Sequence, residues 1–176
     1  NGLETTELLL RKNKAQQVSE NIENLQTSAR ESMQQLRDSI WALTKEEMTV
    51  GLLFDRYKLW MQKMFESSSS HLHFTESLDP DVPIDSIKAL NLFRILQEAS
   101  HNILKHAQAK DIWINISLQQ NLQIEITDNG KGFKSVRDES YGLNNMKQRA
   151  ATIGAKVLIK STIGKGTSVL LNTPIG

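Results

Sequence analysis

The chain of 176 residues contains no cysteine, which excludes disulfides, thiolate metal sites and cysteine nucleophiles. No apolar run approaches the length of about 20 residues that a membrane-spanning helix requires. An excess of one charge is also missing, because 21 basic residues stand against 20 acidic ones. Overall charge therefore gives no reason to expect binding to nucleic acid or to an anionic membrane. Function must depend on local groups of side chains.

The first 66 residues have a helical composition. Proline is absent from residues 3–66 and Gly51 is the single glycine there, which favours helix. Apolar residues recur at steps of three and four, as in helices that pack into a bundle or coiled coil with a partner helix. They are Ile22, Leu25, Ala29, Ser32 or Met33, Leu36, Ile40 and Leu43, continued by Val50, Leu53, Tyr57, Trp60 and Met64. Thr44–Glu47 has a capping-box pattern, which marks either a new helix or a polar turn of one long helix.

Ser67–Ser70 interrupts this pattern and is predicted to be a linker. After it, strand periodicity is expected over residues 71–75, 111–118, 122–128, 157–161 and 167–172. Helices are expected from Pro83 to about Ala107 and over residues 142–153. We therefore predict an α+β chain: a long N-terminal helical element, residues 1–66, followed by a sandwich, residues 67–176. The sandwich has a mixed sheet with helices on one face.

Asp128 ends a strand of alternating apolar residues and falls on their side, which is expected to face the core. A buried carboxylate requires partners, because an unpaired buried charge is costly. Asp128 can form a turn with Asn129 and Gly130, as is common for an isolated Asp-Asn-Gly. Alternatively it is a hydrogen-bond acceptor at the mouth of a pocket, where Gly130 and Gly132 let a flat ligand approach the backbone.

A polar stripe runs along the helix predicted after Pro83. Glu98, Asn102 and Lys105 fall on one face at about 100° per residue, and Arg94 extends this face upstream. Such a stripe is compatible with an ordinary solvated helix face. It also matches a nucleoside triphosphate, because a carboxylate orients water, an amide oxygen ligates magnesium and a lysine neutralises phosphate.

Four segments, in this order, resemble the successive nucleotide-binding segments of the histidine-kinase ATPase domain. They are Glu98–His106, Asp128–Phe133, Tyr141–Met146 and Gly164–Thr167. The resemblance covers roughly residues 67–174. Upstream, Ala29–Leu43 is similar to the second helix of the dimerisation and phosphoacceptor bundle in the short-lid subfamily of sensor kinases. The resemblance implies ATP and Mg²⁺ as cofactors.

The resemblance also implies roles for individual residues. Asp128 would accept a hydrogen bond from the adenine amino group, and Thr167 would assist it. The base pocket and its neighbouring turn would contain Gly130, Gly132, Gly164 and Gly166. Asn102 would ligate Mg²⁺, Glu98 would lie near the metal or the attacking group, and Lys105 and His106 would contact phosphate. Gly142 and Leu143, at the start of a helix, would bring backbone amides to the phosphates, and residues 134–141 would form the ATP lid.

The acceptor histidine of this family lies on the first bundle helix and is followed by an acidic residue. None of the four histidines here, His71, His73, His101 and His106, is followed by Asp or Glu. The chain also begins Asn1-Gly2 without methionine, so we expect a piece of a longer protein with the acceptor upstream.

We therefore expect a cytoplasmic catalytic fragment of a two-component sensor histidine kinase. It would form a homodimer through the bundle and serve a response regulator. It would have no direct contact with nucleic acid, and any membrane link would come from upstream segments. The alternatives are a related clamp ATPase and a non-catalytic helical dimerisation module.

Overall fold

The computed structural model describes residues 48–134 and 141–175, together with single residues between 18 and 40. The chain divides into two compact units, residues 1–41 and residues 42–176. In the first unit the described residues are helical, as predicted. Its apolar seam is exposed, with Leu25 at 70% and Leu36 at 64% of full exposure. Leu43 and the capping-box pattern of Thr44–Glu47 lie outside the described residues.

Helix α2, Val50–Met64, opens the described part of the second unit. Thr49 has an extended backbone, and its side chain accepts a hydrogen bond from Leu52 N at 3.2 Å. A helix therefore begins at Val50, and the alternative of one uninterrupted helix is wrong. The apolar face of α2 is buried within this unit, at Val50, Leu53, Phe54, Tyr57 and Met61. The compact unit thus begins upstream of the boundary predicted between residues 66 and 67.

The five strands form one mixed sheet in the order β1-β2-β3-β5-β4. Strands β1 (His71–Ser77) and β2 (Asp111–Leu118) are parallel. Strand β3 (Leu122–Asp128) is antiparallel to β2 and to β5 (Gly166–Thr173), which forms a hairpin with β4 (Lys156–Thr162). The predicted bounds of β2 and β3 are confirmed, and the predicted α+β class with a mixed sheet is confirmed with them.

Helix α3, Ser86–Asn102, begins later than predicted. Its N-cap is Asp85, whose Oδ1 accepts hydrogen bonds from Ile87 N at 2.9 Å and Lys88 N at 3.0 Å. Pro83 instead forms an isolated bridge with Thr49. Helix α3 continues into a π-helix, η1, over Ile103–Ala107. The last helix, α4, spans Tyr141–Thr152.

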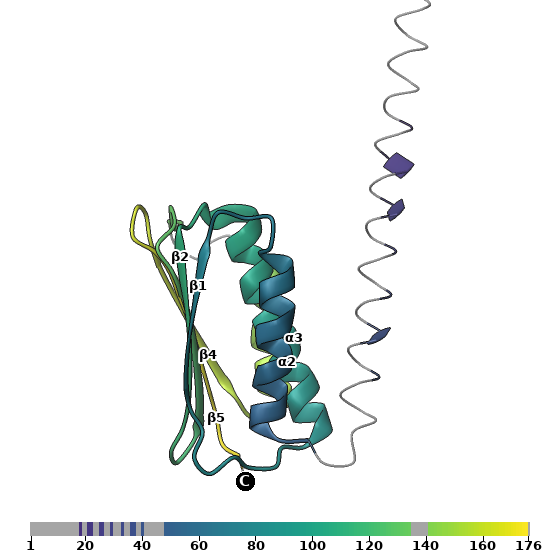
Figure 1. Cartoon of the computed structure of the whole chain (residues 1–176), viewed down its shortest axis with the longest axis vertical. Coiled ribbons are helices and arrows are strands. Elements are labelled where there is room, and N and C mark those ends of the chain that lie inside the picture. The colour runs from purple at the N-terminus through teal and green to yellow at the C-terminus, as the bar shows by residue number, and fades with distance from the viewer. Residues whose placement is uncertain are drawn as a thin grey trace, which may run out of the picture. The chain divides into compact units, whose positions relative to one another are not determined.

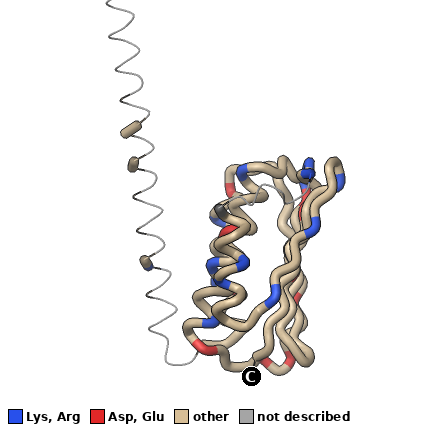
Figure 2. The backbone as a smooth tube through the Cα atoms, turned by 180° about the vertical axis from the view of Figure 1, so that it is seen from behind, with Lys and Arg blue, Asp and Glu red and all other residues tan. Residues whose placement is uncertain are grey.

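The helices cover one face of the sheet, with α2 and α3 side by side (Figure 1). The core between the layers is formed largely by the inward residues of β2 and β3, all at most 2% exposed. They are Ile112, Ile114, Ile116, Leu122, Ile124 and Ile126. Basic and acidic positions are interspersed over the helices and strands (Figure 2), consistent with the balanced charge of the sequence.

A buried hydrogen bond joins α2 to α3. Tyr57 is fully buried, and its hydroxyl lies 2.6 Å from Ser100 Oγ. Ser100 donates its own proton to Leu96 O at 2.8 Å, so Tyr57 is the donor of the pair. Burial raises the pKa of the Tyr57 phenol, which therefore stays neutral at physiological pH.

Removing one or both partners of this pair should have unequal effects. Ser100→Ala leaves the buried phenol without an acceptor and should lower the free energy of unfolding by about 2 kcal/mol. Tyr57→Phe leaves Ser100 bonded to Leu96 O and should lower it by about 1 kcal/mol. The double variant should be at least as stable as Ser100→Ala, because no orphaned group remains. Urea denaturation measures all three, and simple addition of the two losses would contradict this account.

Candidate functional site

Asp128 lies at the inward-facing end of β3, as the strand alternation predicted, and is 2% exposed. Its Oδ1 accepts a hydrogen bond from Gly130 N at 2.8 Å, which is the turn-forming role considered from the sequence. Its carboxylate also accepts the backbone N–H of Thr167, its cross-strand neighbour on β5. Burial raises the pKa of Asp128, and the two backbone hydrogen bonds oppose this shift. A carboxylate has about four acceptor positions, so capacity for a ligand remains.

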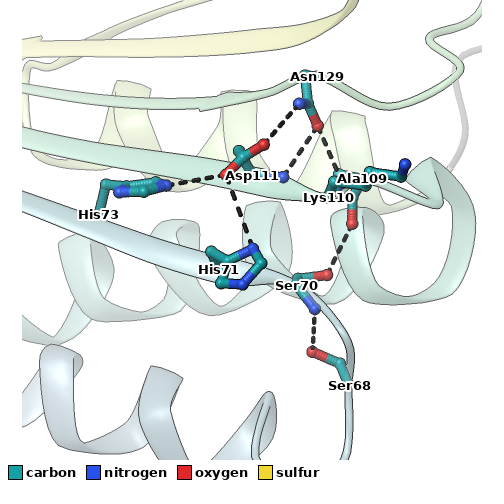
Figure 3. A network of polar contacts seen from close by, with 8 residues as sticks. All are labelled: Ser68, Ser70, His71, His73, Ala109, Lys110, Asp111 and Asn129. Carbon is teal, nitrogen blue, oxygen red and sulfur yellow. Dashed lines mark hydrogen bonds and ion pairs between the residues drawn. The ribbon is translucent and has the colours of Figure 1, made fainter.

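Asn129 anchors the turn after Asp128 to the start of β2 (Figure 3). Its Oδ1 accepts hydrogen bonds from Lys110 N at 2.9 Å and Asp111 N at 3.0 Å. Its Nδ2 donates to Asp111 Oδ2 at 3.0 Å, while the other oxygen of Asp111 lies 3.0 Å from His73 Nε2. The hydrogen bond with His73 is the largest influence on Asp111 and lowers the pKa of its carboxyl group.

Sequence reasoning placed Asn129 in the turn after Asp128 but predicted no partner for its side chain, and it gave Asp111 no role in the site. The polar residues after β3 indicated a turn, but the partner strand that holds this turn follows only from the sheet order.

The glycines of the site lie where backbone segments approach closely. A side chain at Gly130 would overlap the carbonyl of Ala107, and one at Gly132 would overlap that of Thr162. Gly166 has a φ of +84°, and a side chain there would overlap the carbonyl of Asp128. The chain's own packing therefore already requires glycine at these positions. The approach of a flat ligand remains a prediction.

Ser161 is a further residue whose role the sequence analysis did not predict. Its Oγ lies 2.9 Å from Thr167 Oγ1 and 3.2 Å from Gly166 O, and it accepts a hydrogen bond from Phe133 N at 2.9 Å. Ser161 thus joins the loop after β3 to the β4–β5 hairpin. Ser161 and Thr167 are cross-strand partners, so the register of the predicted hairpin was the signal that could have revealed this pair.

A second group of predicted residues meets at the end of α3 and the start of α4. A side chain at Gly142 would overlap the carboxylate of Glu98, so these two positions are in contact. Leu143, the next residue, is buried in α4. Among the described residues, Nδ2 of Asn102 is buried and has no hydrogen-bond partner. The donor Nδ2 of this amide is therefore not used by the described part of the fold.

Lys105 and His106 occupy exposed positions on the π-helix η1. A π-helix has more residues per turn than an α-helix. The spacing from Asn102 to Lys105 therefore differs from the 100° per residue used for the predicted stripe, and a common face for Glu98, Asn102 and Lys105 remains a prediction. Ala107, at the end of η1, accepts a hydrogen bond from Lys131 N at 2.8 Å. The irregular turn thus brings the end of the helix to the loop that follows Asp128.

No group of three His, Asp or Glu side chains able to hold a metal ion occurs within the part of the chain that the structure describes. His71 Nδ1 and His73 Nε2 lie 3.8 Å and 3.0 Å from the same oxygen of Asp111. His73 also stacks on Trp113, with ring centroids 5.5 Å apart.

No helix among the described residues is long and apolar enough to cross a bilayer.

The profile of the histidine kinase-, DNA gyrase B- and HSP90-like ATPases matches residues 87–176, half of the chain. The chain belongs to this family of ATPases. Within the family it resembles the sensor histidine kinases, as the sequence predicted. It is 42% identical over 88 residues to the sensor histidine kinase LiaS of Bacillus subtilis, covering 48% of this chain and 24% of that protein.

Further relatives agree. The sensor histidine kinase YdfH of Bacillus subtilis is 33% identical over 132 residues, which is 72% of this chain and 32% of that protein. The sensor protein VraS of Staphylococcus haemolyticus is 41% identical over 88 residues, or 48% of this chain and 25% of that protein. The chain thus spans between about a quarter and a third of the length of these curated relatives.

Solved structures share the fold. The histidine kinase domain of the blue-light activated histidine kinase from Erythrobacter litoralis has a TM-score of 0.62 at 16% identity, covering 80% of this chain and 75% of that one. The catalytic domain of the histidine kinase ThkA has a TM-score of 0.60 at 13% identity, covering 74% and 97%. At these identities the likeness establishes the arrangement of helices and strands.

Two glycines of one turn provide a matched test of close packing around Asp128. Gly164 and Gly166 both have positive φ, at +73° and +84°, but a side chain at Gly164 meets nothing within 4 Å. Gly164→Ala should lower the free energy of unfolding by about 1 kcal/mol, from backbone strain alone. Gly166→Ala should cost clearly more, because the carbonyl of Asp128 must also move. Equal losses in thermal or urea denaturation would show that the close approach is unimportant.

The buried carboxylate of Asp128 should destabilise the ligand-free protein at neutral pH. Its pKa is raised on folding, so its contribution to stability is favourable below the unfolded pKa and is lost as pH rises through the folded value. We expect Asp128→Asn to be at least as stable as the wild type near pH 7. This advantage should shrink as the pH is lowered and Asp128 becomes protonated. Urea denaturation at a series of pH values tests this, and an advantage that grows toward acid would contradict it.

Proposed function

We propose that this chain is the ATP-binding catalytic part of a two-component sensor histidine kinase. It would bind MgATP and transfer the γ-phosphoryl group to a histidine on a bundle helix, for relay to an aspartate of a response regulator. The observation that carries the proposal is the inward-facing, 2% exposed carboxylate of Asp128, set among glycines of two separate segments, the loop after β3 and the β4–β5 turn. Membership of the ATPase family supports it.

The end of the site around Asp128 would bind the adenine base. The carboxylate keeps free acceptor capacity beside its bonds to the Gly130 and Thr167 backbones. An exocyclic amino group is a donor that such an acceptor recognises. Thr167 would assist from β5, and Gly130, Gly132, Gly164 and Gly166 would shape the surrounding loops.

The end of the site around α3 and α4 would bind the phosphates and Mg²⁺. Oxygen donors are the ligands that Mg²⁺ prefers. The residues fit this ion, because Glu98 and Asn102 carry oxygen ligands one helical turn apart. The buried Nδ2 of Asn102, which has no partner among the described residues, would donate a hydrogen bond to a phosphate oxygen. Asn102 would ligate the metal through Oδ1, with Glu98 as a second possible ligand. Leu143 would help to seat Gly142 at the start of α4, where backbone amides and the helix dipole favour anions.

The chain's own contribution to the chemistry would be position and charge. Bound Mg²⁺ would neutralise phosphate charge, and Lys105 and His106 would add positive or hydrogen-bonding groups on η1. The reaction would form a bond between an imidazole nitrogen and the γ-phosphorus and break the bond to the bridging oxygen of ADP. Glu98 would orient the attacking imidazole or accept its proton. Holding the two reactants in line would supply most of the rate increase.

Partners follow from the same proposal. The exposed helical seam of the first unit, at residues such as Ile22, Leu25, Leu36 and Ile40, would form a homodimer through a helical bundle. The protein would act in the cytoplasm on a response regulator, without direct contact with nucleic acid. Any membrane link would come from upstream segments. The acceptor histidine would lie upstream of Asn1, and the short lid would span residues 134–141, of which 135–140 lie outside the described residues.

A calorimetric titration of the protein with a non-hydrolysable ATP analogue and Mg²⁺ tests the proposal directly. Wild-type protein should bind with saturation, and Asp128→Asn should lose at least about tenfold in affinity, because the amide is a poorer acceptor and presents a donor to the base. Asp55→Asn is the matched control, since Asp55 is exposed and pairs with Lys58 on α2. Its affinity should be unchanged.

The outcomes separate the alternatives. Failure of folded wild-type protein to bind would favour the helical dimerisation module. Steady ATP hydrolysis without an acceptor helix would favour the clamp ATPase. Binding without self-phosphorylation, together with phosphorylation of a supplied acceptor helix, is the result that the proposal requires.

A further inference from the structure

We propose that α2 sets the rotation of α3 about its axis, and that Tyr57 and Ser100 are positioning residues for Glu98 and Asn102. The inference rests on the proposed function, because it concerns how the metal and phosphate end of that site is held. The sequence analysis gave neither Tyr57 nor Ser100 a role in the site, and Ser100 is fully buried.

The geometry of α3 carries the argument. Glu98 and Asn102 are four residues apart and lie within about 40° of each other around the helix. Ser100, midway between them, points about 160° away from either. On one side of α3, therefore, Ser100 is bonded to Tyr57 of α2 at 2.6 Å. On the other side, Glu98 contacts the start of α4 at Gly142.

A second contact lies one residue further along α3. The ring of Trp60 on α2 meets His101 edge to face, with centroids 5.4 Å apart. Trp60 and Tyr57 also contact Phe93, earlier on α3, at 6.3 Å and 6.5 Å. Helix α2 thus contacts α3 at two levels about two helical turns apart, at Phe93 and at Ser100 with His101. The aromatic contacts are apolar and tolerate small rotations, whereas the buried hydrogen bond is directional.

Helix α2 is itself fixed at its first turn. Gly51 N donates a hydrogen bond to Asp81 Oδ1 at 2.8 Å, and Thr49 forms a bridge with Pro83 just before α3 begins. Ser100 also bonds back to Leu96 O within α3, two residues before the helix gives way to η1. A displacement of α2 would therefore be transmitted to the end of α3, where Asn102 lies.

This arrangement predicts a selective defect in nucleotide binding. Loss of the Tyr57–Ser100 bond should loosen the rotation of α3 and so misplace Glu98 and Asn102. It should leave the base end of the site intact, because Asp128 is held by β3, β5 and Asn129. The affinity gained when Mg²⁺ is added should fall, while affinity for the nucleotide without Mg²⁺ should persist.

The experiment measures the affinity for a non-hydrolysable ATP analogue with Mg²⁺ and with EDTA, by calorimetry, and compares the two values as a ratio. In Ser100→Ala and in Tyr57→Phe this ratio should fall on the order of fivefold, which corresponds to the net free energy of one ordinary hydrogen bond. The double variant should show the same fall and not its square, because both changes remove one interaction. Tyr57→Phe keeps the ring packing and so provides a folded variant if Ser100→Ala is too unstable.

Ser168→Ala is the control. Ser168 Oγ donates to Glu125 Oε1 at 2.9 Å on the outer side of the sheet, away from α2, and its loss should leave the ratio unchanged. An unchanged ratio in both test variants, whether both affinities stay the same or both fall equally, would overturn the positioning role and leave the proposed function standing. A folded wild-type protein that binds no nucleotide would overturn both.

Discussion

The carboxylate of Asp128 faces the core at the end of β3, and much of the surrounding architecture follows from holding it there. A buried charge is unfavourable unless hydrogen bonds compensate it. Two backbone N–H groups, from Gly130 and Thr167, provide this compensation in part. To supply them, the β4–β5 hairpin must approach so closely that Gly166 has no room for a side chain. Asn129 and Ser161 then hold the two loops in place.

The end of α3 is joined through η1 to the loop that follows this carboxylate. The shift from α-helix to π-helix after Asn102 places the Ala107 carbonyl where it accepts the Lys131 N–H. The base end and the phosphate end of the proposed site therefore share the loop after β3. Departures from regular helix geometry are common at functional sites. Here the departure has a structural cause, because it lets a helix end meet a strand end.

Stability and proposed function make opposite demands on this unit. The isoleucines of β2 and β3 and the aromatic residues of α2 are buried and stabilise the fold. In the ligand-free state, Asp128 and the unpartnered Nδ2 of Asn102 lower the stability of the fold. Each is a buried polar group whose hydrogen bonding the described residues complete only in part. Such groups are understandable where a ligand completes their hydrogen bonding.

Local patterns in the sequence determined the strands and the direction of Asp128. Alternating isoleucines predicted β2 and β3 to the residue, and the same period of two predicted that Asp128 faces inward. The sequence also sufficed for the resemblance to histidine kinases. Tertiary structure alone decided that the apolar face of α2 packs on α3, that Pro83 bridges to Thr49, and that the helix after Asn102 widens into a π-turn. It also selected Asp111, Asn129 and Ser161 as anchors. These features depend on contacts between segments far apart in the chain, and a helical or strand period carries no information about which distant segment a residue will meet.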